Sequence, residues 1–174
     1  ESVHSIFDSK TEKLDCSNDY NDTNQPISIK FENVNFNYTK DTLTLKNLSI
    51  DFKPGAKNAI VGTTGSGKTT ILNLIGRLYE VDSGIVSFNG QDISQYGITS
   101  IRDQITIVSQ DIVIFDQSLE DNIRYADPKA TEKEVMDAAI NAKIENLIHE
   151  RKGAPVGPKG GQLSGGQKQR VALA

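Results

Sequence analysis

Polar and apolar residues alternate between residues 28 and 38, which is the pattern of a half-buried β-strand. The alternation slips once, at Glu32 and Asn33, so we predict a strand with a bulge or a turn at that point. A second strand is predicted over residues 43–52. The apolar positions of the first strand are Ile29, Phe31, Val34, Phe36 and Tyr38.

A strand, a loop and a helix are predicted in turn between residues 59 and 78. Residues 59–61 form a short apolar run that enters a glycine-rich turn. After the turn, four apolar residues fall at positions i, i+3, i+4 and i+7, which is the spacing of an amphipathic helix. They are Ile71, Leu74, Ile75 and Leu78.

Further elements are predicted on both sides of this unit. Short β-branched runs at residues 85–88 and 105–108 are typical of strands. Thr131 and Glu134 have the types and spacing of a capping box, and they open a helix whose apolar positions are Val135, Ala138, Ala139 and Ala142. Residues 15–25 are polar and rich in turn formers, and they end at Pro26, so we interpret them as a linker.

Composition narrows the class of protein. The 174 residues are 36% hydrophobic and 24% charged, which is typical of a soluble globular domain. The net charge of −4 disfavours nonspecific binding to nucleic acid. No apolar run is long enough to cross a bilayer. One cysteine, Cys16, cannot form an internal disulfide, which fits a reducing compartment.

Residues 62–69 read Gly-Thr-Thr-Gly-Ser-Gly-Lys-Thr, which fits the P-loop pattern between a predicted strand and a predicted helix. The glycines let backbone N–H groups turn toward phosphate oxygens, and the helix beginning near Gly67 adds its positive N-terminal end. In this pattern Lys68 lies against the β- and γ-phosphates, and the Thr69 hydroxyl ligates Mg²⁺. The alternative, a glycine-rich turn with an exposed lysine, explains less of the pattern.

Residues 163–167 read Leu-Ser-Gly-Gly-Gln and follow a second glycine-rich approach. Ser164 and Gln167 have the spacing of a capping box, so the segment can be simply a helix start. Capping leaves Gly165 and Gly166 unexplained, because glycine is unfavourable in a first helical turn unless something approaches the backbone closely. We interpret the segment as a second phosphate-facing surface, and it hints at a partner chain.

The order of these motifs resembles the nucleotide-binding domain of ABC transporters. Residues 163–167 are similar to the family's signature motif, and Gln110 in Val-Ser-Gln-Asp is similar to the Q-loop glutamine. Tyr38 matches the aromatic residue that stacks on adenine, a use that suits a ring face; its alternative is an ordinary strand aromatic. Two segments resemble those of the exporter branch of the family. Residues 118–124 are similar to the exporter segment after the Q-loop, and residues 1–8 are similar to the tail of the last transmembrane helix.

The resemblance implies a set of site residues. Lys68 and Gln110 are expected to be catalytic, and Thr69 and Gln110 to hold Mg²⁺. ATP is the expected nucleotide. Its expected binding residues are Tyr38, Gly62, Thr63, Thr64, Gly65, Ser66, Gly67, Lys68, Thr69, Thr70, Ser164, Gly165, Gly166 and Gln167.

The implied fold is an α/β P-loop NTPase domain of ABC type, with an N-terminal antiparallel β-subdomain, a helical subdomain and a core sheet that is incomplete in this chain. Residues 1–26 are expected to be a linker from a transmembrane domain, and residues 27–174 the ATP-binding domain. The implied partners are a second such domain, head to tail, and a transmembrane domain of the same polypeptide, with no nucleic acid. We expect membrane association, with this domain on the cytoplasmic or matrix face.

The resemblance also implies segments after the signature motif. In the family an apolar strand ending in Asp-Glu (Walker B), a D-loop and a switch histidine follow, and we expect none of them within residues 1–174. The resemblance therefore implies that these residues bind ATP and hydrolyse it poorly, since general-base assistance is worth ~10² to 10⁴ in rate.

Two other classes of function stay open. ATPases of chromosome maintenance and DNA repair share both motifs, but they carry a long coiled coil after the Q-loop, and no heptad repeat lies between Gln110 and Leu163. The second is a non-enzymatic nucleotide-binding remnant. The sequence after residue 174 distinguishes these possibilities. An apolar strand ending in Asp-Glu there would identify the protein as an ATPase and not as a non-enzymatic remnant.

Residues 1–174 by themselves are predicted to be marginally stable or to aggregate. In P-loop ATPases of this type, strands from later in the sequence lie between the predicted strands 59–61 and 105–108. Unpaired backbone groups and apolar faces on such strands are costly. Circular dichroism during heating is expected to show a broad or irreversible transition, and a cooperative melt of a soluble monomer would contradict this.

Overall fold

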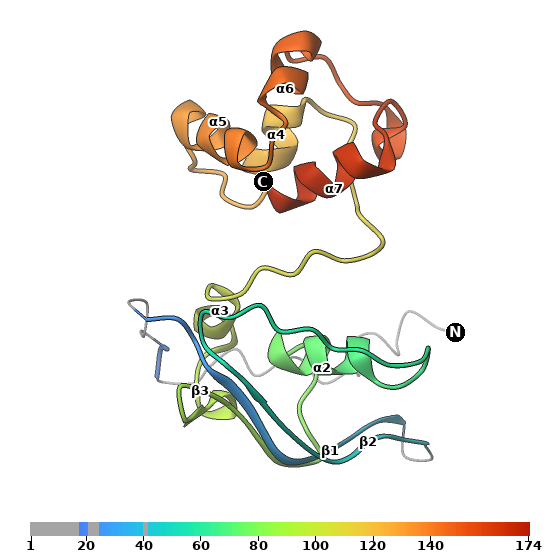
Figure 1. The fold of residues 1–174 in the computed structure, drawn as a ribbon. Coiled ribbons are helices and arrows are strands. Elements are labelled where there is room, and N and C mark those ends of the chain that lie inside the picture. Colours follow the sequence, from blue (N-terminus) through green and yellow to red (C-terminus); the bar gives the residue numbers. More distant parts are fainter. Residues whose placement is uncertain (1–17, 21–24, 40–41) are drawn as a thin grey trace, which may run out of the picture. The chain divides into compact units, whose positions relative to one another are not determined.

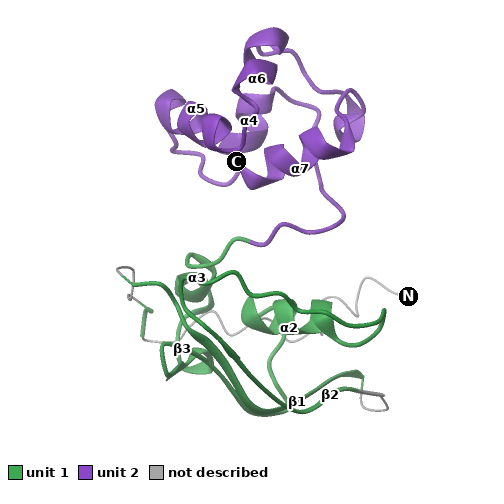
Figure 2. Ribbon diagram, viewed as in Figure 1, with its two compact units in different colours: residues 1–106 green, residues 107–174 purple. Residues whose placement is uncertain are grey.

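The computed structural model describes residues 18–20, 25–39 and 42–174 (Figure 1). The chain divides into two compact units, residues 1–106 and residues 107–174 (Figure 2). We call them unit 1 and unit 2. Among the described residues, the sheet lies in unit 1, and the secondary structure of unit 2 is helical. This division agrees with the predicted β-subdomain and helical subdomain.

Unit 1 is built on a four-stranded sheet in the order β2-β1-β3-β4, with every neighbouring pair antiparallel. The strands are β1 (Ile29–Thr39), β2 (Thr42–Phe52), β3 (Ser83–Phe88) and β4 (Gln91–Asp92). The helical elements of the unit are α2 (Lys68–Ile75), η1 (Ile93–Gln95) and α3 (Ile98–Arg102).

The predicted irregularity in the first strand is confirmed. The register of β1 against β2 shifts between Phe31 and Val34, and Asn33 between them has a φ of 50°, in the left-handed region. The extra residue lets Phe31, Val34 and Phe36 all point to one buried face. The slip in the polar-apolar pattern therefore marks a bulge in a continuous strand.

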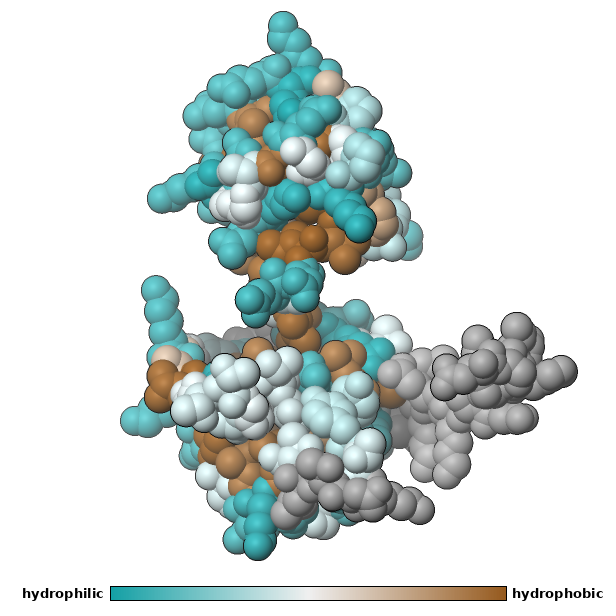
Figure 3. Space-filling model, turned by 90° about the vertical axis from the view of Figure 1, so that its right-hand side faces the viewer, coloured by the Kyte–Doolittle hydropathy of each residue, from teal (hydrophilic) through white to brown (hydrophobic). Residues whose placement is uncertain are grey.

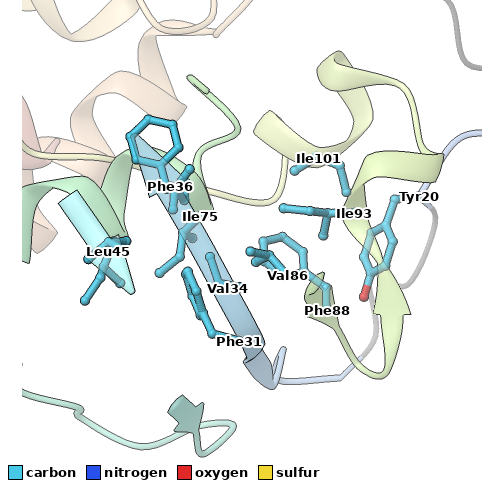
Figure 4. Close-up of a cluster of buried hydrophobic side chains, with 12 residues drawn as sticks. Tyr20, Phe31, Val34, Phe36, Leu45, Ile75, Val86, Phe88, Ile93 and Ile101 are labelled. Carbon is cyan, nitrogen blue, oxygen red and sulfur yellow. The ribbon is translucent and has the colours of Figure 1, made fainter. Parts of the chain in front are cut away.

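The core of unit 1 lies between this face of the sheet and α2. Figure 4 shows Phe31, Val34, Val86 and Phe88 of the strands beside Ile75 of the helix. The other buried residues of α2 are Thr70, Ile71 and Leu74. Burial of this helix face against the sheet places the loop that precedes α2.

Tyr20 belongs to the same core, although it comes from the segment interpreted as a linker. It is only 2% exposed, and Figure 4 shows it in the cluster of buried side chains with Phe88. Its ring makes edge-on contacts with Tyr96 at 5.5 Å and with Phe88 at 6.0 Å between centroids. Its N–H donates to Ser100 Oγ at 2.9 Å, and Gly97 N donates to the Asn18 carbonyl at 3.0 Å. Residues 18–20 are thus attached to the start of α3. Residues 1–8, which resemble the tail of a transmembrane helix, lie outside the described residues.

Two predicted strands and one helix end are wrong. Residues 59–61 and 105–108 are extended but form no strand in the part of the chain that the structure describes. A buried parallel strand needs hydrogen-bonded neighbours, and here Val61 is 89% exposed. The core sheet is therefore incomplete in this chain, as expected.

Helix α2 ends at Ile75, so Leu78 lies outside it and is exposed. Gly76 closes the helix, and Arg77 takes a left-handed conformation with a φ of 49°. The Leu78 N–H then donates to the Asn73 carbonyl at 2.9 Å, which turns the chain away from the helix axis.

Unit 2 contains α4 (Leu119–Arg124), α5 (Glu132–Asn141), α6 (Glu145–Arg151), η2 (Pro158–Gly160) and α7 (Gly165–Leu173). The predicted helix over residues 131–142 is confirmed as α5, with both hydrogen bonds of the Thr131–Glu134 capping box present. The backbone hydrogen bond from Thr131, and next the bond from its hydroxyl, lower the pKa of the Glu134 carboxyl.

Each unit keeps some apolar surface. Figure 3 shows hydrophobic areas on both units among mostly hydrophilic side chains. Val61, Ile107 and Val113 are exposed hydrophobic residues. None of the helices in the described ranges is long and apolar enough to span a bilayer.

The buried tyrosine yields a stability prediction. Tyr20→Ala removes a fully packed ring, so it is expected to lower the free energy of unfolding of unit 1 by about 3 kcal/mol. Val61→Ala trims a side chain of the same unit that is 89% exposed and serves as the control, with an expected cost of about 0.5 kcal/mol or less. Hydrogen exchange of the β1 and β3 amides in the intact protein measures the loss of stability in both variants. Equal losses in the two variants would contradict the anchoring of Tyr20.

Candidate functional site

The predicted P-loop, residues 62–69, connects the extended run after residue 58 to α2. Gly65 and Gly67 have φ values of 83° and 85°, which side chains with a Cβ rarely adopt. A Cβ on Gly67 would also lie 2.6 Å from Leu45 Cδ2. Two glycines of the pattern are therefore required by the backbone itself.

The N-terminus of α2 has no side-chain cap. Gly67 is the N-cap residue, and within the described residues this helix end has no side-chain capping hydrogen bond. The first N–H groups of a helix have no partner within the helix, and they carry its positive end. An anion is the ligand that such an end binds best.

The ammonium group of Lys68 lies within the loop. Its Nζ donates to the carbonyls of Gly62 at 2.9 Å and Thr63 at 2.6 Å, and it lies 3.4 Å from Ser66 Oγ. Residues 62–70 contain no acidic side chain, and within the described residues the contacts given for Nζ are with two main-chain carbonyls and the Ser66 hydroxyl. The lysine charge and the helix end thus act on the same small region.

Tyr38 contacts the P-loop helix. Its hydroxyl donates to Thr70 Oγ1 at 3.2 Å and accepts from Asn73 Nδ2 at 3.1 Å. The side chain is 45% exposed, and its ring makes an edge-on contact with Tyr79 at 5.0 Å. The structure therefore brings Tyr38 and residues 62–70 together in unit 1. The hydroxyl of Thr70 is buried, whereas Thr69 is exposed.

Two neighbours of Tyr38, Asn73 and Tyr79, are not among the site residues predicted from the sequence. Asn73 lies three residues after Thr70, so helical spacing alone places it on the same face as Thr70. Tyr79 follows the turn that ends α2, and no local pattern indicates its contact with Tyr38.

The segment 163–167 begins α7 in unit 2. The Ser164 hydroxyl accepts from Gln167 N at 3.3 Å, and Gln167 Oε1 accepts from Ser164 N at 2.7 Å, which confirms the capping box. A Cβ built on Gly165 or Gly166 meets nothing within 4 Å. Within unit 2, neither packing nor a left-handed φ requires these two glycines.

Gln110 lies in an exposed loop of unit 2, where the Ser109 hydroxyl donates to the Asp111 carbonyl at 2.6 Å. Gln110 and the segment 163–167 thus belong to one unit, and Lys68 and Tyr38 to the other. That these groups meet at one nucleotide stays a prediction.

The glycine-rich loop before α2, with Lys68 at the helix end, is a P-loop, which is the phosphate-binding element of a class of nucleotide-binding domains. Residues 45–174 match the family described as ABC transporter. The chain belongs to this family. As a family, ABC transporters bind ATP and are ATPases.

Several known proteins resemble this chain. "ABC transporter B family member 24, mitochondrial" of Arabidopsis thaliana is 45% identical over 150 residues, which cover 84% of this chain and 22% of that protein. "Iron-sulfur clusters transporter ATM1, mitochondrial" of Saccharomyces cerevisiae is 41% identical over 87% of this chain and 22% of that protein. The human "ATP-binding cassette sub-family B member 6" is 45% identical over 84% of this chain and 18% of that protein.

A solved structure places the fold among exporters. The "Structure of a bacterial Atm1-family ABC exporter with ATP bound" has a TM-score of 0.88 and 38% sequence identity, and the match covers 97% of this chain and 30% of that one. The chain is an exporter-type ABC nucleotide-binding domain, as the motifs predicted. It spans about a fifth of the length of these curated relatives. The comparisons do not favour the chromosome-maintenance alternative.

Proposed function

We propose that this chain is the ATP-binding and ATP-hydrolysing part of a membrane exporter. The observation that carries the proposal is the N-terminus of α2, where an uncapped helix end and the Lys68 ammonium lie together in a loop with no acidic group. Such an arrangement favours a polyphosphate, because both the charge and the N–H donors interact with anionic oxygens.

Residues 62–70 are proposed to bind the phosphates and Tyr38 to stack on the adenine. An aromatic ring that is half exposed beside the P-loop helix offers a face to a base. Mg²⁺ fits the hard oxygen donors proposed for it, the Thr69 hydroxyl and the Gln110 side-chain carbonyl, and it commonly takes few protein ligands besides substrate phosphates. When bound, Mg²⁺ neutralises charge on the β- and γ-phosphates. Gln110 is proposed to position the attacking water.

The glycines of the signature segment support a partner chain. Gly165 and Gly166 leave open space beside the first turn of α7, and nothing in their own unit uses it. We propose that a second nucleotide-binding domain, facing head to tail, brings its bound phosphates to Ser164, Gly165, Gly166 and Gln167. Closure of the two domains on ATP would then reorient the membrane helices, and hydrolysis would reset them.

The proposed setting is a membrane. Residues 1–26 are proposed to connect this domain, residues 27–174, to a transmembrane domain of the same polypeptide. The word mitochondrial in two of the relatives' names supports a mitochondrial membrane, and this domain is proposed to lie on the cytoplasmic or matrix face. Residues 1–174 by themselves are proposed to hydrolyse ATP poorly, because the general-base carboxylate expected from the resemblance is not among the predicted site residues.

Lys68→Ala in the full-length protein tests the phosphate site. Loss of one charged donor to phosphate is expected to weaken ATP binding by about 10- to 100-fold, enough to lose retention in a filter assay. Lys57→Ala removes an exposed lysine outside the loop and should bind as wild type. Unchanged affinity in Lys68→Ala would overturn the assignment of the P-loop.

Gly166→Ala tests the partner surface. The added methyl group has no neighbour within 4 Å in unit 2 outside the local backbone, and alanine favours a helix by about 1 kcal/mol over glycine, so α7 should be as stable as before or more so. We expect unchanged ATP binding and at least about tenfold slower turnover in the full-length protein, because the methyl group obstructs close approach of a partner.

The matched control is Gln169→Ala, an exposed position on the same helix, which should leave turnover unchanged. Wild-type turnover in Gly166→Ala would argue against a partner at this helix end. Unchanged turnover together with weakened ATP binding would place the glycine in the chain's own site instead.

A further inference from the structure

Tyr38 is held at its hydroxyl end by two residues of the P-loop helix. The hydroxyl donates to Thr70 Oγ1 at 3.2 Å and accepts from Asn73 Nδ2 at 3.1 Å. Thr70 is buried and follows the P-loop directly, and Asn73 lies one turn further along α2. The position of the Tyr38 hydroxyl is therefore tied to the same helix that presents Lys68.

The ring of Tyr38 is held by two further aromatic rings. Phe36, which is buried in the core, meets it at 4.8 Å between centroids with an interplanar angle of 85° (Figure 4 shows Phe36 in the core). Tyr79 meets it at 5.0 Å and 89°. Phe36 and Tyr79 also contact each other at 5.7 Å. Edge-to-face pairs are directional, so three rings in mutual contact fix the orientation of each plane.

The placement of Tyr79 depends on how α2 ends. Arg77 turns the chain in a left-handed conformation, and its guanidinium donates to Glu80 and to the carbonyls of Ile93 and Tyr96. The Leu78 N–H bonds back to the Asn73 carbonyl at 2.9 Å. Tyr79 thus comes from a fixed turn, and Asn73 contributes to both the turn and the Tyr38 hydroxyl.

We propose that Asn73 and Tyr79 are positioning residues that hold the Tyr38 ring ready for a purine base. The inference rests on the proposed binding of ATP. A ring whose orientation is already fixed loses less conformational entropy when a base stacks on it. Neither residue needs to touch the phosphates, so their effect is confined to the part of the affinity that the base supplies.

The test compares two ligands in the full-length protein, ATP and inorganic tripolyphosphate, which has no base. Asn73→Ala and Tyr79→Leu are expected to raise the Kd of ATP by about 3- to 10-fold and to leave the Kd of tripolyphosphate unchanged. Asn73→Ala replaces a weak helix former by a strong one within α2, so loss of folding is not expected.

Three controls accompany these variants. Leu72→Ala changes an exposed residue of the same helix and should leave both dissociation constants at the wild-type value. Tyr79→Phe keeps the ring and should retain wild-type ATP affinity, whereas Tyr79→Leu does not. Lys68→Ala should weaken the binding of both ATP and tripolyphosphate if the proposed phosphate site is correct. An error in the assignment of the phosphate site can therefore be distinguished from an error in this inference.

Three results would contradict the inference. If Asn73→Ala and Tyr79→Leu weaken ATP and tripolyphosphate equally, the two residues support only the helix, with no specific action on the base. If both variants bind ATP as the wild type does, the contacts with Tyr38 are without consequence for the nucleotide. A loss of ATP affinity in Tyr79→Phe equal to that in Tyr79→Leu would assign the effect to the Tyr79 hydroxyl and contradict the role of its ring.

Discussion

The positive N-terminus of α2, left without a side-chain cap, is the constraint on which the rest of the site depends. Gly67 begins the helix in a left-handed conformation and supplies no side-chain acceptor. Lys68 adds a full charge at the same place, and its ammonium is bonded to the main-chain carbonyls of Gly62 and Thr63. Main-chain carbonyls shape the loop without cancelling that charge, so the region favours an external anion. This preference for an anion agrees with the membership of the chain in a family of ATPases.

Helix α2 connects this loop to the rest of unit 1. Its buried face packs on the sheet, and Thr70 and Asn73 bond to the Tyr38 hydroxyl. Beyond the other end of the helix, Arg77 donates to the Tyr96 carbonyl, and the Tyr96 ring contacts Tyr20. A segment interpreted as linker is therefore attached through a short series of contacts to the helix that carries the P-loop. Movement of that segment relative to unit 1 would have to break the contacts of a buried tyrosine.

Local signals predicted the parts of this fold that short-range chemistry decides. The bulge near Asn33 followed from one slip in alternation, and the helix starts at Thr131 and Ser164 followed from capping-box spacing. Residues 59–61 and 105–108 have the composition of strands, but a strand also needs neighbours, and composition does not supply them. Tyr20 was placed in a linker because its neighbours in sequence are polar, whereas its partners Phe88 and Tyr96 are distant in sequence. The roles of Asn73 and Tyr79 depend on tertiary contacts with Tyr38 in the same way.

The most direct measurement of the central claim is hydrogen exchange of the backbone amides of residues 62–70 in the full-length protein, with and without nucleotide. If these N–H groups bind phosphate oxygens, ATP and inorganic tripolyphosphate both slow their exchange, and adenosine does not. Exchange in this segment that stays the same with saturating ATP, or that slows equally with adenosine, would contradict the account.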